Sequence, residues 1–487
     1  MIAFGDNKPY KRLFGIEKSD SNIIMPNYSD FLIAVSIIYS SELPQCKNTL
    51  RDHNNRGVLV KFLENFSRKV DVESMNMGAF LWLKSYVFNQ EKQFQRNPIE
   101  QVFRYYSIFS FPGVIERIEE KIRMPFKTFI YCAFWIYTQF KEGFYVKVNR
   151  LTHLGIEYEK TPFSEENLLT TLDTLSIDFA LLKKITKDEM DYSREFIFNN
   201  PDYPHIKYPL FNYDNICFCV NPRYLIDKFT ENVYNLAEIF KGDNIAYGQS
   251  FENYVGKILI ETIKYHSIEN VSVIPEQIYN KGQNRTSDWI VQDEENIVLI
   301  ECKAKKFTTL SKVETDINKS FIDDIVENQL FSKESKRKYI DSCENALTKD
   351  IIIIGMGIGK MYKVCNDYLN NEIDTLPFNS PQIIRPILVT LEEWFTGIPD
   401  VREAITIVAK GYLRYKSISC DLIDKFPFQI MSVSNLTIDF QMMVTDGITQ
   451  YYHCVSNNEL MNKRMGANFD VVSDLFEKEF FDSLKVE

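Results

Sequence analysis

The stretch TSDWIVQDEENIVLIECKAKK, residues 286–306, decides how the rest of the chain is interpreted. Two apolar runs, SDWIV and IVLIECK, flank the polar QDEEN, a pattern that predicts a β-hairpin. Strand side chains alternate between faces, so Glu301 and Lys303 share one face, while the opposite face is apolar and buried. Asp288 lies near the start of the first run. Opposite charges at the end of a buried strand are costly unless they pair, bind a metal or take part in chemistry.

Length and composition bound the class of protein. A chain of 487 residues predicts two to four domains, and its 45% apolar and 25% charged content is ordinary for a folded protein. The net charge of −11 argues against an overall basic nucleic-acid binder, so any such contact needs a local basic surface. The nine cysteines and five histidines are scattered without metal-binding spacing, which predicts reduced thiols, a cytoplasmic location and no structural zinc.

Targeting signals are not expected. The first fifteen residues lack the apolar segment of a signal peptide. The longest early apolar run, residues 31–39, is too short to cross a bilayer, so we expect no membrane association.

The pattern of the chain divides it into three regions. Residues 1–240 are mainly helical, with a buried aromatic helix at 129–140 and a short strand at 215–220. We expect this region to recognise a substrate, a partner or a trigger, or to regulate the rest of the chain. Residues 245–435 mix strands with helices and form an α/β domain. Residues 436–487 form a helical C-terminal extension.

Within the α/β region the order of elements can be predicted. A helix is expected at 250–265, four strands at 271–277, 285–291, 296–303 and 383–391, a further strand near 428–434, and a helix inside 315–331. Residues 351–360, IIIIGMGIGK, are predicted as a strand and turn. They lack the glycine spacing of a Walker or Rossmann phosphate loop.

Asp288 and Glu301 are the first candidate site residues. Carboxylates at adjacent strand ends repel each other, and a divalent cation relieves that repulsion. Mg²⁺ takes oxygen ligands, so the two carboxylates and the backbone carbonyl of Cys302 would suffice. The ion would activate a water and neutralise charge on a phosphate, and Lys303 would hold or help deprotonate the water or stabilise the transition state. The alternative is a structural salt bridge between Glu301 and Lys303.

Glu252 is the fourth candidate. Its neighbours on the same helix face are Val255, Gly256 and Leu259, so it lies on the packing face, and Gly256 would let the helix approach the sheet closely. The alternative is an acid placed in the first helical turn, where the helix dipole favours it.

Together these residues resemble the PD-(D/E)xK nuclease superfamily, the restriction-endonuclease-like fold with an αβββαβ core. The resemblance covers residues 245–435. It implies that Asp288 and Glu301 bind the metal, that Lys303 serves the water or the phosphate, and that Glu252 supports the metal site. The sequence departs from the pattern at Ser287, where the family motif has proline.

The resemblance implies a Mg²⁺-dependent nuclease, with Mn²⁺ able to substitute, whose expected substrate is DNA. A restriction or anti-phage defence role follows only by analogy with the family. Two alternatives remain open: an RNA nuclease, and a non-catalytic nuclease-like module that binds nucleic acid or protein. A partner protein or a homodimer is compatible with either. Basic residues in 305–338 could engage phosphates, although interspersed acids make an ordinary charged surface equally compatible.

Overall fold

The chain forms two compact units, Met1–Asp243 and Asn244–Glu487, each with both helices and sheet. The computed structural model describes residues 98–140, 145–152, 164–189, 207–213, 215–219, 222–239, 244–304, 317–332, 334–335, 340, 342–376, 383–392, 398–457, 459–460, 464 and 470–481. The early apolar run at 31–39 lies outside these residues. Among the helices described, none combines the length and apolarity that a bilayer crossing requires.

The first unit is mainly helical in its described part. Its helices are α5 (Pro98–Phe109), α6 (Ile115–Ile122), α7 (Phe126–Gln139), α8 (Val148–Thr152), α9 (Glu165–Leu175), α10 (Phe179–Glu189), α12 (Pro222–Phe229) and α13 (Val233–Leu236). Helix α7 contains the aromatic band predicted at 129–140, and Phe129, Ile130 and Ile136 are fully buried in it. The prediction of a core helix there is confirmed.

A small sheet accompanies these helices. It consists of β1 (Tyr145–Lys147), β2 (Ser176–Asp178), β3 (Leu210–Tyr213) and β4 (Ile216–Cys219), in the order β1-β4-β3-β2. Strand β4 confirms the strand predicted at 215–220, with Cys217 and Cys219 turned into the core. The other three strands were not expected, because three or four residues carry too little periodicity to be recognised.

The second unit is built on a five-stranded mixed sheet. Its strands are β5 (Ser272–Pro275), β8 (Trp289–Gln292), β9 (Asn296–Lys303), β10 (Ile383–Thr390) and β11 (Gln429–Ser432), in the order β11-β10-β9-β8-β5. Strands β5, β8 and β9 are antiparallel neighbours, whereas β9, β10 and β11 run parallel. The predicted hairpin is confirmed, with Gln292 opposite Ile297 across the turn.

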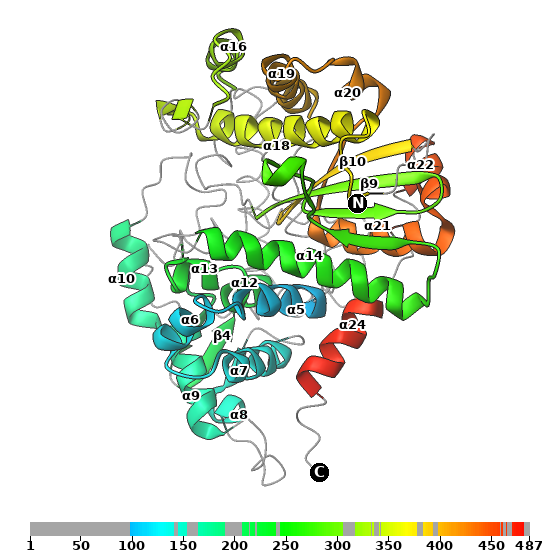
Figure 1. Ribbon diagram of the computed structural model, residues 1–487. Coiled ribbons are helices and arrows are strands. Elements are labelled where there is room, and N and C mark those ends of the chain that lie inside the picture. The colour runs from blue at the N-terminus through cyan, green and yellow to red at the C-terminus, as the bar shows by residue number, and fades with distance from the viewer. Residues whose placement is uncertain are drawn as a thin grey trace, which may run out of the picture. The chain divides into compact units, whose positions relative to one another are not determined.

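Helices cover both faces of this sheet. They are α14 (Asn244–His266), α16 (Lys319–Glu327), α18 (Ala346–Leu369), α19 (Pro399–Tyr415), α20 (Asp421–Lys425), α21 (Val433–Asp446), α22 (Ile448–Ser456) and α24 (Asp470–Phe476), with the π-helical turn η5 (Glu477–Phe481) after the last. Helices α18 and α19 lie on one side of the sheet, and α14 and α21 lie on the other (Figure 1). The helices after residue 435 therefore belong to the same compact unit as the sheet.

Helix α18 corrects the prediction for residues 351–360, which form neither strand nor turn. Nearly every residue of this segment is buried, and a helix buried all round has no apolar stripe to distinguish it from a strand. The glycines serve close helix packing. A Cβ at Gly355 would lie 2.6 Å from Cβ of Val408, and one at Gly359 would lie 2.7 Å from Cδ1 of Tyr412, both on α19.

The strand predicted at 285–291 is interrupted. Its first residue belongs to a short separate hairpin, β6 (Ile278–Tyr279) and β7 (Asn284–Arg285), joined by the 3-10 turn η4 (Asn280–Gly282). Residues 286–288 then lead into β8.

Candidate active site

The β8–β9 hairpin brings Asp288 to the end of β9. Trp289 is paired with Ile300, so the same register carried one residue further sets Asp288 opposite Glu301. The Asp288 carboxylate accepts a hydrogen bond from the backbone N–H of Cys302, with 2.6 Å between Oδ2 and N. Asp288 and Glu301 therefore share one end and one face of the sheet, as the sequence predicts.

Lys303 and Glu301 form an ion pair on that face. The Lys303 ammonium lies 2.6 Å from Oε1 of Glu301 and donates a second hydrogen bond, of 3.1 Å, to the carbonyl oxygen of Cys302. The Glu301 side chain is only 12% exposed and that of Lys303 is 28% exposed. Helix α18 covers the lysine through Gly357, where a Cβ would lie 3.4 Å from Cε of Lys303.

Glu252 occupies a different position on its helix from the one expected. Helix α14 begins at Asn244, so Glu252 lies in the third turn, beyond the first turn in which a helix dipole favours acids. Its backbone carbonyl accepts a 2.9 Å hydrogen bond from the indole N–H of Trp289, the residue after Asp288. A Cβ at Gly256 would lie 1.9 Å from Cζ2 of that indole, so Gly256 does allow the close approach that the sequence predicts.

The three acids and Lys303 perturb one another. Burial and the Glu301 charge raise the pKa of Asp288 to about 8, against the opposing effect of Lys303. Burial also raises the pKa of Glu252, with smaller contributions from Glu301 and Glu276 that Lys303 opposes. Burial alone would lower the pKa of Lys303, but the Glu301 and Asp288 carboxylates outweigh it and raise that pKa. The site holds three carboxyl groups and one cation, and the raised pKa of Asp288 follows from that imbalance together with burial.

The donor atoms suit a hard divalent cation. Asp288 and Glu301 supply carboxylate oxygens, and Cys302 supplies a backbone carbonyl. Two carboxylates are enough for Mg²⁺, which retains several waters. Within the described residues no group of three or more His, Cys, Asp or Glu side chains is arranged to hold a metal. The Glu252 charge contributes to raising the pKa of Asp288, so Glu252 lies within electrostatic reach of the site.

Two neighbouring side chains take no direct part. Burial raises the pKa of the Cys302 thiol, which keeps it neutral, so Cys302 contributes its backbone atoms only. Ser287, the residue before Asp288, is 1% exposed, and its hydroxyl has no hydrogen-bond partner in the part of the chain that the structure describes.

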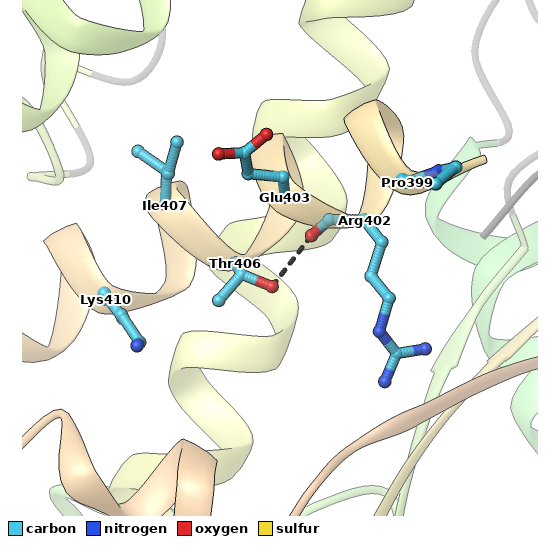
Figure 2. Close-up of a pocket in the computed structure, with 6 residues that line it drawn as sticks. All are labelled: Pro399, Arg402, Glu403, Thr406, Ile407 and Lys410. Carbon is cyan, nitrogen blue, oxygen red and sulfur yellow. Dashed lines mark hydrogen bonds between the residues drawn. The ribbon is translucent and has the colours of Figure 1, made fainter. Parts of the chain in front are cut away.

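A separate hollow of about 460 Å³ lies along α19, and none of the four candidate residues lines it. Figure 2 shows its walls: Pro399, Arg402, Glu403, Thr406, Ile407 and Lys410. Its charged groups do not converge on a common point, and the Thr406 hydroxyl donates a hydrogen bond to the carbonyl of Arg402. The strand end with its converging carboxylates is therefore the better candidate for chemistry.

One sequence prediction near the site falls largely outside the described residues, and one residue beside the site was not predicted. Most basic residues of 305–338 lie outside the described residues, with Lys319 an exception on α16. The residue that sequence reasoning missed is Trp289, whose indole ties the strand carrying Asp288 to the helix carrying Glu252. Gly256 on the packing face of α14 was the feature of the sequence that could have indicated a bulky side chain packed against that helix.

Comparison of the chain with models of known protein families, with characterised proteins and with solved structures finds no match. The assignment of a function therefore depends on the residues of the site themselves.

Proposed function

We propose that the second unit is a Mg²⁺-dependent nuclease of the PD-(D/E)xK type that hydrolyses phosphodiester bonds in DNA. One observation carries the proposal: Asp288, Glu301 and Lys303 meet at the end of one buried strand, two acids with one lysine. Carboxylates beside a lysine suit phosphodiester chemistry, in which a metal and a cation neutralise the developing charge.

The order of elements supports the restriction-endonuclease-like fold. Helix α14 is followed by three antiparallel strands, β5, β8 and β9. After helices α16 and α18, strand β10 returns parallel to β9. This order of elements agrees with an αβββαβ core in which two helices, α16 and α18, precede the last strand. The β6–β7 hairpin and Ser287 are departures from the pattern.

Asp288, Glu301 and the carbonyl of Cys302 would hold the ion, and Glu252 would support it through intervening water. Bound there, Mg²⁺ would activate a water and neutralise charge on the phosphate. Lys303 must then release the Cys302 carbonyl that it now contacts.

The residues of the chain contribute orientation and charge. In the reaction, the water oxygen bonds to phosphorus, the bond from phosphorus to the leaving sugar oxygen breaks, and a proton ends on that oxygen. Lys303 carries a raised pKa while the carboxylates are unneutralised, so it enters the site as a cation. In that form it stabilises the charge on the phosphate oxygens and orients the water, rather than acting as the base.

One observation favours the non-catalytic alternative. The Lys303 ammonium already pairs with the Glu301 carboxylate, and the Cys302 N–H already donates a hydrogen bond to Asp288. A purely structural ion pair would have the same contacts. RNA as the substrate requires the same residues and is an outcome of the assay below. The cytoplasmic location fits the described cysteines, which carry thiols rather than disulfides. By family analogy alone, the proposal also includes a role in defence and assembly with a partner protein or a second copy of the chain.

The decisive experiment is cleavage of plasmid, linear DNA and RNA with Mg²⁺ and with EDTA. Wild type is compared with Asp288→Asn, Glu301→Gln and Lys303→Met. The matched control is Glu294→Gln, an exposed acid at the opposite end of the same hairpin. We expect Mg²⁺-dependent cleavage by wild type and the control only. Equal activity in all five proteins would refute the assignment, and retained binding without cleavage by wild type would favour the non-catalytic alternative.

A further inference from the structure

The segment that precedes Asp288 has an unusual composition. Residues 277–287, QIYNKGQNRTS, contain two basic side chains and four carboxamides, and no acid, in a chain of net charge −11. Lys281 and Arg285 are the basic residues. A local basic surface in an acidic protein is where contact with a polyanion is expected.

The segment projects as the β6–β7 hairpin. Ile278 pairs with Arg285 and Tyr279 pairs with Asn284. At the tip, Asn280, Lys281 and Gly282 all have positive φ, of 50°, 52° and 85°, and all three are exposed. A left-handed conformation costs a non-glycine residue roughly 1–2 kcal/mol. Such conformations persist where the surroundings enforce them, and they concentrate at functional sites.

The hairpin is anchored to helix α18 through Tyr279, the residue just before its tip. Tyr279 is 2% exposed, and its hydroxyl donates to Oδ2 of Asp367 at 2.5 Å. The ammonium of Lys363 lies 2.5 Å from the same oxygen. Both partners belong to α18, the helix that also covers Lys303 through Gly357. One helix therefore positions both the hairpin and the lysine of the site.

The hairpin base lies within electrostatic reach of the site. The backbone N–H of Thr286 donates to the carbonyl of Gln277 at 2.9 Å, which closes the hairpin two residues before Asp288. Arg285 lies 3.0 Å from Oε2 of Glu276, and the charge of Glu276 raises the pKa of Glu252. Asp288 is the third residue after Arg285, a span of at most about 11 Å.

We propose that the β6–β7 hairpin is a rigid arm that binds the sugar–phosphate backbone of the nucleic acid beside the scissile phosphate. Lys281 and Arg285 contact phosphates, and the exposed carboxamides of the tip face the bases. At a rise of about 3.4 Å per nucleotide, Arg285 reaches within about three nucleotides of the bond that is cut. The inference rests on the proposed nuclease function, because that function supplies the polyanionic substrate.

The test is equilibrium binding of short fluorescein-labelled DNA and RNA, single-stranded and duplex, in EDTA, which prevents cleavage. Fluorescence anisotropy is measured over a range of salt concentrations for wild type, Lys281→Asn and Arg285→Gln. Asparagine suits the left-handed backbone at 281, so the first variant removes the charge without adding strain. The matched control is Lys264→Asn, an exposed lysine twelve residues, or about 18 Å, along α14 from Glu252. Thermal unfolding of each variant verifies its fold.

Each arm variant is expected to reduce the slope of log affinity against log salt by about 0.9, with a loss of roughly eightfold in affinity at about 0.1 M salt. Lys264→Asn should leave both unchanged. Wild-type slopes in both arm variants, or no nucleic-acid binding by wild type, would overturn the proposal.

The arm and the nuclease function fail separately. If wild type cuts with Mg²⁺ while the arm variants bind like wild type, only the arm is refuted. If wild type never cuts and the arm variants still lose affinity and slope, the nuclease function is refuted, while the contact of the arm with nucleic-acid phosphates is upheld.

Discussion

Replacing Gly256 with alanine is expected to destabilise the second unit and disturb the site. The added Cβ would lie 1.9 Å from Cζ2 and 2.4 Å from Cε2 of Trp289, so the indole must move. Overpacking of this kind costs about 2 kcal/mol. Moving the indole also breaks its hydrogen bond to the Glu252 carbonyl, which contributes about 1 kcal/mol. Alanine recovers about 1 kcal/mol through its higher helix propensity.

The net loss is about 2 kcal/mol, which for a unit of this size lowers the melting temperature by about 4–8 °C. Gly248→Ala is the matched control on the same helix, because no atom lies within 4 Å of a Cβ at that position. This variant gains only the higher helix propensity of alanine, so it should melt about 2–4 °C higher than wild type. Circular dichroism melts of the two variants give the comparison directly. Equal stability of Gly256→Ala and Gly248→Ala would refute the packing of Trp289 against α14.

Three further predictions concern the charges of the site. In EDTA the folded protein keeps a proton on Asp288 up to about pH 8, whereas the unfolded chain releases it near 3.8, so the stability of wild type should fall as pH rises between these values, by at most about 1.4 kcal/mol per pH unit. Asp288→Asn should flatten this dependence in thermal melts, and an unchanged slope would show that Asp288 does not bind the proton. Mg²⁺ or Mn²⁺ at a hundred times its dissociation constant should stabilise wild type by about 2.7 kcal/mol but leave the melting temperature of Asp288→Asn unchanged. Lys303→Met should keep the metal-induced rise in melting temperature yet lose cleavage by about 10²–10³-fold, and equal cleavage would remove Lys303 from the chemistry.

The hairpin and its charges were predictable because several local signals agree. Alternating faces, a polar connection and a long apolar run specify β9 to the residue, from Asn296 to Lys303. The register of that hairpin then sets Asp288 opposite Glu301 without further information. Site residues carried by one local element can thus be inferred from sequence.

Other features depend on contacts that sequence does not record. Residues 351–360 are buried on nearly all sides, with Gly355 and Gly359 facing α19 and Gly357 facing the sheet, so a helix was mistaken for a strand. The β6–β7 hairpin has only two residues in each strand, and its anchor on Asp367 joins positions 88 residues apart. Glu252 was correctly placed on the packing face of its helix but not in the correct turn, because the helix begins six residues before the predicted start.

The most direct measurement of the central claim is anomalous diffraction from crystals of the protein grown with Mn²⁺. We predict a peak between the carboxylates of Asp288 and Glu301, about 2.0–2.2 Å from their oxygens and from the Cys302 carbonyl, with the Lys303 ammonium moved off that carbonyl. Asp288→Asn crystals should lack the peak. The account would be contradicted if saturating Mn²⁺ gave no density at this position while the Lys303 contacts to Glu301 and to the Cys302 carbonyl stayed intact.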